Sequence, residues 1–80
     1  MTREEVFEAL NVIFRNNFDD DTITLSEETS AGDIDDWDSL EQINLVVAIQ
    51  ERFGIKFNVD EVNAMKNVGQ MVDAIIGKTA

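Results

Sequence analysis

Ser39 lies among carboxylates, in the segment "DDWDSLE" that spans residues 35–41. Asp38, directly before it, is a residue type that caps helices well, so we expect Ser39 to be the first helical residue with its hydroxyl in solvent. Three kinds of chemistry are open to this hydroxyl: nucleophilic catalysis, participation in a metal site, and attachment of a covalent group.

The rest of the sequence does not support catalysis at this serine. The chain contains no His and no Cys, so the commonest general base and the usual thiol nucleophile are both missing. No nucleophile elbow surrounds Ser39, and no sequence that would form a pocket accompanies the carboxylates beside it. We therefore expect no catalytic residue and a protein that is not an enzyme.

The carboxylates also fail as a calcium-binding loop. An EF-hand loop needs closely spaced oxygen ligands, a glycine at position six and a bidentate glutamate at position twelve. Counted from Asp33, position six is Asp38 and position twelve is Asn44. We expect weak, unspecific binding of divalent ions and no dedicated metal site.

The elements that position Ser39 are predicted to be helices, because apolar residues recur with a helical period after four capping-box patterns. The spacing predicts helices over residues 3–16, 39–53 and 59–65, and a last one from residue 68 to a stop at Gly77. Gly54 is placed to end the second helix. The four capping pairs are Thr2 with Glu5, Asp38 with Glu41, Asn58 with Glu61, and Asn67 with Gln70.

The segment over residues 18–37 is long for a connection between helices and rich in Asp, Thr, Ser and Glu. Its scattered apolar residues indicate that it is pinned across the helices, and Trp37 is expected to pack as a hydrophobic staple. The stretch "FGIKFNV" alternates like a strand but is too short and isolated to build a sheet. We predict an all-α fold in one domain, residues 1–80: a small four-helix bundle of three main helices and a short third helix, with a long loop between helices one and two.

Charge limits the partners of this protein. Seventeen acidic and six basic residues give a formal net charge of −11, and ten of the acids lie between Asp19 and Glu41, where there is no base. Such a charge disfavours nucleic acid and anionic membrane surfaces and favours partners with basic patches. With neither a long apolar run nor a secretory signal in the sequence, we expect a cytoplasmic monomer that binds no nucleic acid and has no membrane span.

The segment "DDWDSLEQINLVVAIQERFGIKF" resembles the centre of acyl carrier proteins, whose signature is Asp-Ser-Leu at the start of the second helix. The resemblance extends over essentially the whole chain, including the long first loop and the ending "NVGQMVDAI". It implies that Ser39 carries 4′-phosphopantetheine through a phosphodiester, attached by a phosphopantetheinyl transferase that uses coenzyme A. Asp38 and Leu40 would be part of the transferase's recognition motif, and the thiol of the arm would hold an acyl group as a thioester.

The same resemblance implies a partner-facing surface on the second and third helices. Acyl- or aminoacyl-loading enzymes and acyl-processing enzymes with basic patches would dock there. The residues implied are Glu41, Asn44, Val47, Ala48, Glu51 and Met65. An acyl chain would need an apolar cleft between helices two and three, for which the candidates are Ile43, Val47, Ile49 and Met65.

Two features depart from carriers of general fatty acid synthesis, which look more acidic along the second helix. Amides and a base replace expected acids at Gln42, Asn44, Gln50 and Arg52, and Trp37 is more typical of specialised, aminoacyl or peptidyl carriers. Our first interpretation is a carrier for a specialised fatty acid, lipid or polyketide pathway, and the alternative is an aminoacyl or peptidyl carrier. Two further hypotheses are a non-covalent acidic adaptor, in which Ser39 is an ordinary helix-start residue, and a calcium sensor.

Overall fold

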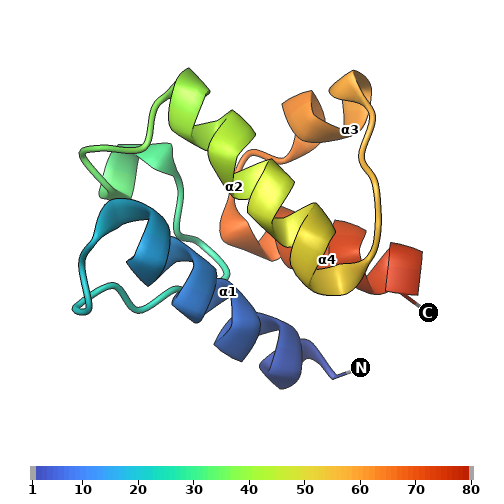
Figure 1. Cartoon of the computed structure of the whole chain (residues 1–80), viewed down its shortest axis with the longest axis horizontal. Helices are drawn as coiled ribbons and strands as arrows, with labels where there is room; N and C mark the ends of the chain where they lie inside the picture. Colours follow the sequence, from blue (N-terminus) through green and yellow to red (C-terminus); the bar gives the residue numbers. More distant parts are fainter. Residues whose placement is uncertain (1, 80) are drawn as a thin grey trace.

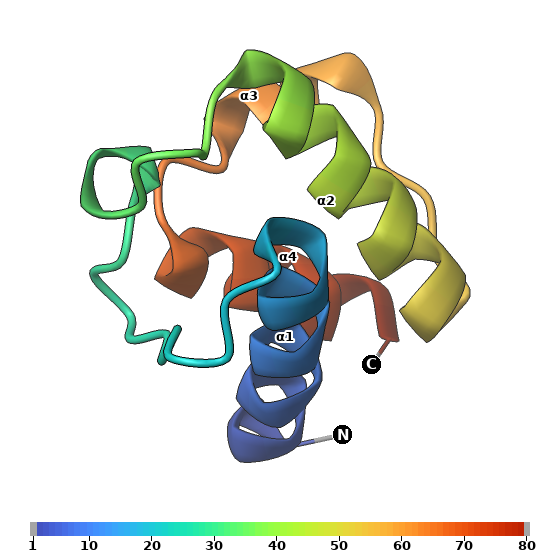
Figure 2. The ribbon, with the colours of Figure 1, turned by 60° about the vertical axis from the view of Figure 1, so that its left-hand side comes forward.

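The fold is all-helical, as predicted. The structure is a computed structural model that describes residues 2–79. These residues form four α-helices, α1 (Arg3–Phe18), α2 (Ser39–Phe53), α3 (Val59–Ala64) and α4 (Val68–Thr79), and one turn of 3₁₀ helix, η1 (Ala31–Asp33). No strand occurs among them. Figures 1 and 2 show α2 and α3 on one side of the molecule, with the long α1–α2 loop along its edge.

Local sequence accounts for most helix boundaries. Thr2 and Asn58 form complete capping boxes at α1 and α3, and α2 ends at Gly54, which adopts a left-handed conformation with φ of 67°. The predicted stop of α4 at Gly77 is wrong, because Gly77 has no positive φ and the helix continues to Thr79, whose hydroxyl donates to the carbonyl of Ile75 at 2.9 Å. α1 is also two residues longer than predicted.

The core lies between α1, α2 and α4, and the loop contributes to it. Leu25 and Trp37 from the loop are each 7% exposed, so the prediction that the loop is pinned is confirmed. The ring of Trp37 packs edge-on against Phe14, with 5.1 Å between the ring centroids. The fully buried side chains of the helices are Val6, Leu10, Phe14, Leu45, Ile49, Val68, Met71, Val72 and Ile75.

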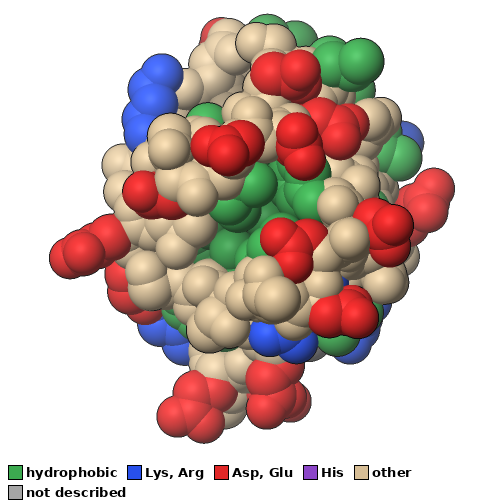
Figure 3. All heavy atoms as spheres, turned by 90° about the vertical axis from the view of Figure 1, so that its left-hand side faces the viewer, with side chains coloured by type: hydrophobic (Ala, Val, Ile, Leu, Met, Phe, Trp, Pro, Cys, Tyr) green, Lys and Arg blue, Asp and Glu red, His purple; other side chains and the backbone are tan. Residues whose placement is uncertain are grey.

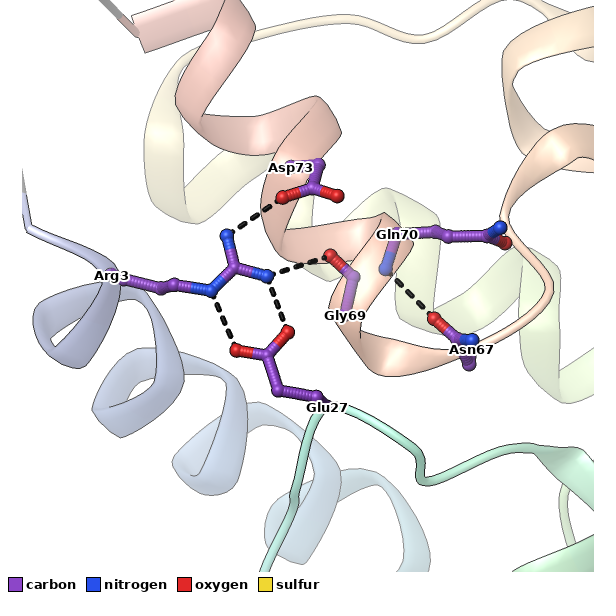
Figure 4. A network of polar contacts seen from close by, with 6 residues as sticks. All are labelled: Arg3, Glu27, Asn67, Gly69, Gln70 and Asp73. Carbon is purple, nitrogen blue, oxygen red and sulfur yellow. Dashed lines mark hydrogen bonds and ion pairs between the residues drawn. The ribbon is translucent and has the colours of Figure 1, made fainter.

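A single side chain, Arg3, joins α1, the loop and α4 (Figure 4). Its Nε donates to Glu27 Oε2 at 2.6 Å, and its Nη2 also pairs with Glu27. Its Nη1 donates to Asp73 Oδ1 at 2.7 Å, and Nη2 makes a longer hydrogen bond of 3.3 Å to the carbonyl of Gly69. The guanidinium therefore holds three segments that are far apart in the sequence.

The loop backbone caps the first turn of α4. The carbonyl of Glu27 accepts from the N–H of Gly69 at 2.9 Å, and the carbonyl of Thr29 accepts from the N–H of Val68 at 2.8 Å. These N–H groups have no partner within their own helix, so the loop satisfies them. The predicted cap Asn67 adds a side-chain bond, since its Oδ1 accepts from the N–H of Gln70 at 2.8 Å. This contact fixes the loop that leads toward Ser39.

The Glu27 carboxylate makes stability depend on pH. Hydrogen bonds from Arg3 hold the pKa of Glu27 below its ordinary value of 4.5, so this contribution is complete above about pH 4.5 and is lost as pH falls through the lower folded-state value. We expect Glu27→Gln to lower stability at pH 7 and to lose most of this difference from wild type near pH 3. Urea unfolding at both pH values measures it, with the exposed Glu28→Gln as control. An equal difference at both pH values would contradict the prediction.

None of the helices within residues 2–79 has the length and apolar character needed to cross a bilayer.

Candidate functional site

Ser39 is the first residue of α2, at the position that its spacing predicts. The backbone of Asp38 is extended, and its Oδ1 accepts from the N–H of Glu41 at 2.9 Å. This cap turns the chain into the helix immediately at Ser39, whose side chain is exposed. Within the described part of the chain, the Ser39 hydroxyl makes no hydrogen bond, so it is free to react with an external group.

The capping box predicted at α2 is half complete. Asp38 caps the N–H of Glu41, but the Glu41 carboxylate does not return to Asp38. Its Oε1 accepts from Asn44 Nδ2 at 2.7 Å, and its Oε2 accepts from Asn17 Nδ2 at 3.4 Å. Both oxygens of this half-buried carboxylate therefore bind amides of the protein itself.

An apolar groove of about 840 Å³ lies between α2 and α3 and extends to Ser39. Three of the four predicted cleft residues line it: Ile43, Val47 and Met65. The prediction for Ile49 is wrong, since its side chain is fully buried in the core. Ile49 follows Val47 by two residues, which is about 200° around a helix, so the two side chains point to opposite sides.

Trp37 connects the start of α2 to the core beneath the groove. Its indole Nε1 donates to Gln42 Oε1 at 2.7 Å, and both residues line the groove. The prediction that Trp37 packs is confirmed by its contact with Phe14. Its partner one turn along α2, however, is the amide of Gln42, so a hydrogen bond stands where a staple would place an apolar contact.

The predicted partner-facing residues differ in how far they reach the surface. Asn44, Val47 and Glu51 are exposed, and Glu41 and Ala48 are half-buried. Met65 follows the last residue of α3 and is 8% exposed, so it offers a partner little surface. The exposed apolar side chains near the groove are Leu40, Ile43, Val47 and Val59.

Sequence reasoning did not identify Val59 or Lys66 as residues of this site. Val59, at the start of α3, is 74% exposed and lines the groove. Lys66, in the short link between α3 and α4, lines it too. Neither belongs to a recognisable motif, because only the tertiary fold places them in the lining of the same groove as Ser39.

Carboxylates gather on the face formed by the α1–α2 loop. Figure 3 shows this face, with acidic side chains around a hollow that is apolar at its bottom. No group of three or more residues that could hold a metal ion occurs within residues 2–79. The acidic surface lies mainly on the loop (Figure 3), whereas the exposed side of α2 near Ser39 is largely apolar. The hollow is lined by Phe18, Ile23 and Ile34 and by Asp20, Asp33, Asp35 and Asp36.

Known proteins share this sequence pattern and this arrangement of helices. The sequence model of the family described as "Phosphopantetheine attachment site" matches residues 19–75. An acyl carrier protein of Acidothermus cellulolyticus is 35% identical over 99% of this chain and 94% of its own length, and one of Myxococcus xanthus is 33% identical over 95% and 96%. The solution structure of a holo acyl carrier protein from Geobacter metallireducens superposes with a TM-score of 0.85, at 49% identity over 90% of this chain and 83% of that one.

Proposed function

The chain belongs to the acyl carrier protein family, and from this membership we propose that Ser39 is the residue that bears its prosthetic arm. Proteins of this family are carriers and not enzymes, and their covalent cofactor is 4′-phosphopantetheine. The arm supplies a thiol that holds an acyl group as a thioester. The observation that supports Ser39 is its free, exposed hydroxyl at the start of α2, beside the apolar groove.

The residues around Ser39 suit a phosphodiester. The backbone N–H groups of Ser39 and Leu40 belong to the first turn of α2 and accordingly have no acceptor inside the helix. The start of a helix favours a negative charge. Asp38 is exposed and Leu40 is 67% exposed, so both can contact a transferase, as proposed for its recognition motif. Residues 2–79 thus provide an accessible attachment point and an anion-tolerant setting.

Mass spectrometry of the intact protein tests this assignment. We expect incubation with coenzyme A and a phosphopantetheinyl transferase to add one phosphopantetheinyl group, and peptide fragmentation to locate it on Ser39. The chain has two other serines, Ser26 and Ser30, so the location is informative. Attachment at either of these, or no addition with several transferases, would contradict the proposal.

We further propose that the carrier serves a specialised fatty acid, lipid or polyketide pathway. The outer side of α2 supports this, because Glu41 is engaged by Asn17 and Asn44 and its exposed neighbours Leu40 and Ile43 are apolar. Such a surface steers basic partners less strongly than a row of free carboxylates does. An aminoacyl or peptidyl carrier is the alternative. Trp37, the residue that favours it, is 7% exposed, packs against Phe14 and lines the groove.

Loading by a malonyl transferase of general fatty acid synthesis tests the specialised role. We expect slow loading of the wild type and a rise of roughly two- to fivefold in Asn44→Glu, which adds a carboxylate and removes one of the amides that bind Glu41. Salt should reduce the gain. Asn16→Glu adds the same charge at an exposed position of α1 and should have little effect. Efficient loading of the wild type would contradict the specialised role.

We propose that residues 1–80 act as one carrier domain and as a cytoplasmic monomer, and the single hydrophobic core of the helices supports the first of these. The proposed partners are the phosphopantetheinyl transferase and acyl-loading and acyl-processing enzymes that contact α2 and α3.

A further inference from the structure

The groove beside Ser39 contains one basic side chain among the described residues, that of Lys66. Its one acidic lining residue is Asp38, whose Oδ1 caps α2. Lys66 lies in the link that follows α3, and Figure 2 shows α3 beside the first turns of α2. Lys66 and Ser39 therefore line one groove with mainly apolar walls.

The charges of Lys66 and Lys56 are not used in the fold, and of these two lysines only Lys66 lines the groove. Arg3 pairs with Glu27 and Asp73, and Lys78 Nζ lies 2.8 Å from Glu61 Oε2. The side chain of Lys66 makes no ion pair or hydrogen bond with any residue from 2 to 79; only its backbone N–H is bonded, to Gln70 Oε1 at 2.7 Å. In a chain with seventeen acids, this ammonium remains available to an external anion.

We propose that Lys66 binds the phosphodiester of the arm carried by Ser39. The inference rests on the proposed attachment at Ser39 and adds a role for a residue outside the attachment motif. A phosphodiester at Ser39 places a negative charge next to Asp38 and close in sequence to Asp35 and Asp36, which disfavours it. Lys66 offsets this repulsion, and its ammonium offers three hydrogen-bond donors.

Apolar side chains form part of the surroundings of this ion pair, although Lys66 and Ser39 are both exposed. Charges attract more strongly where low-dielectric side chains replace part of the surrounding water. Ile43 and Val47 from α2 and Val62 from α3 line the groove in which Lys66 lies. Pairing with Lys66 would direct the first part of the arm toward α3 and away from the acidic loop face.

Lysine acetylation measures the pairing directly. A paired lysine stays protonated and reacts more slowly with acetic anhydride, and peptide mass spectrometry gives the rate for each lysine. On conversion from the apo to the holo form, we expect acetylation of Lys66 to slow about two- to fivefold, the effect of one partly exposed ion pair. Lys56, which is exposed and does not line the groove, serves as the matched control and should react at the same rate in both forms.

Salt and cargo separate the pairing from other causes. The protection of Lys66 from acetylation should disappear at about 1 M salt, where charges are screened within a few ångströms. Protection that persists at this salt concentration would mean that the arm merely covers Lys66, and it would overturn the proposal. Protection that arises only with a succinyl cargo, and not in the unloaded or butyryl-loaded holo protein, would assign the anion to the cargo and also overturn it. Equal rates in the apo and holo forms would do the same.

A second measurement does not depend on lysine reactivity. We expect Lys66→Gln to change the ³¹P chemical shift of the holo protein and Lys56→Gln to leave it unchanged. An unchanged shift in Lys66→Gln would contradict the pairing. Failure of Ser39 to take up the arm would be seen earlier, as a missing mass gain, so the two proposals fail in distinguishable ways.

Discussion

Ser39→Ala is expected to abolish attachment of the phosphopantetheinyl group while the protein remains folded. The hydroxyl oxygen is the atom that would form the ester bond to phosphorus, and alanine has no equivalent. Because the Ser39 side chain is exposed and unbonded among the described residues, its loss should change the free energy of unfolding by no more than about 0.5 kcal/mol. Intact mass after incubation with coenzyme A and transferase, together with urea unfolding, measures both effects.

Ser26→Ala is the matched control for this experiment. Ser26 is also exposed, and its hydroxyl lies 3.1 Å from Thr29 Oγ1 within the loop. This variant should gain the full mass of one arm. A mass gain in Ser39→Ala would show that another residue is the attachment point. A Ser39→Ala protein that lacks the arm but keeps the function of the wild type would favour the non-covalent adaptor.

Gly69→Ala is expected to destabilise the fold by about 1–3 kcal/mol, although alanine is the better helix former. A Cβ at position 69 would lie 2.8 Å from the carbonyl oxygen of Glu27 and 2.7 Å from its Oε1. Neither atom can move away easily, because the carbonyl accepts the N–H of Gly69 and the carboxylate is held by Arg3. The substitution therefore forces the loop away from α4.

Gly77→Ala provides the control in the same helix. A Cβ at position 77 meets no atom within 4 Å, so the helix propensity of alanine should act alone. We expect this variant to be more stable than the wild type by about 0.5–1 kcal/mol. Urea unfolding of the two variants should give changes of opposite sign, and a stabilised Gly69→Ala would contradict the tight contact between loop and helix.

Most of the helical framework could be predicted from local signals. The bounds of α2 follow from Asp38 at its start and Gly54 at its end, and both residues act through their own backbone neighbourhood. The end of α1 was less predictable, because Asp19 closes it in a left-handed conformation with φ of 51° that few residues other than glycine adopt. The error at Gly77 has a related cause: a glycine permits a helix to end but does not require it.

The contacts that position the loop depend on tertiary structure and could not be predicted in this way. Arg3 and Asp73 are separated by 70 residues, and no periodicity in the sequence relates them. At the site, the motif indicated Ser39 correctly as the first residue of α2, and the apolar pattern indicated Ile43 and Val47. Lys66 and Val59 could be assigned to the site only from the tertiary structure, in which they line the groove.

The packing of Trp37 has a practical consequence for experiments on this protein. Trp37 is the single tryptophan of the chain, is 7% exposed, and lines the groove next to Ser39. Indole emission responds to the polarity and hydrogen bonding around the ring, and this ring has one defined partner, Gln42 Oε1. The unlabelled protein therefore contains its own optical reporter, whose spectrum can follow in real time whether an acyl chain enters the groove or stays in solvent.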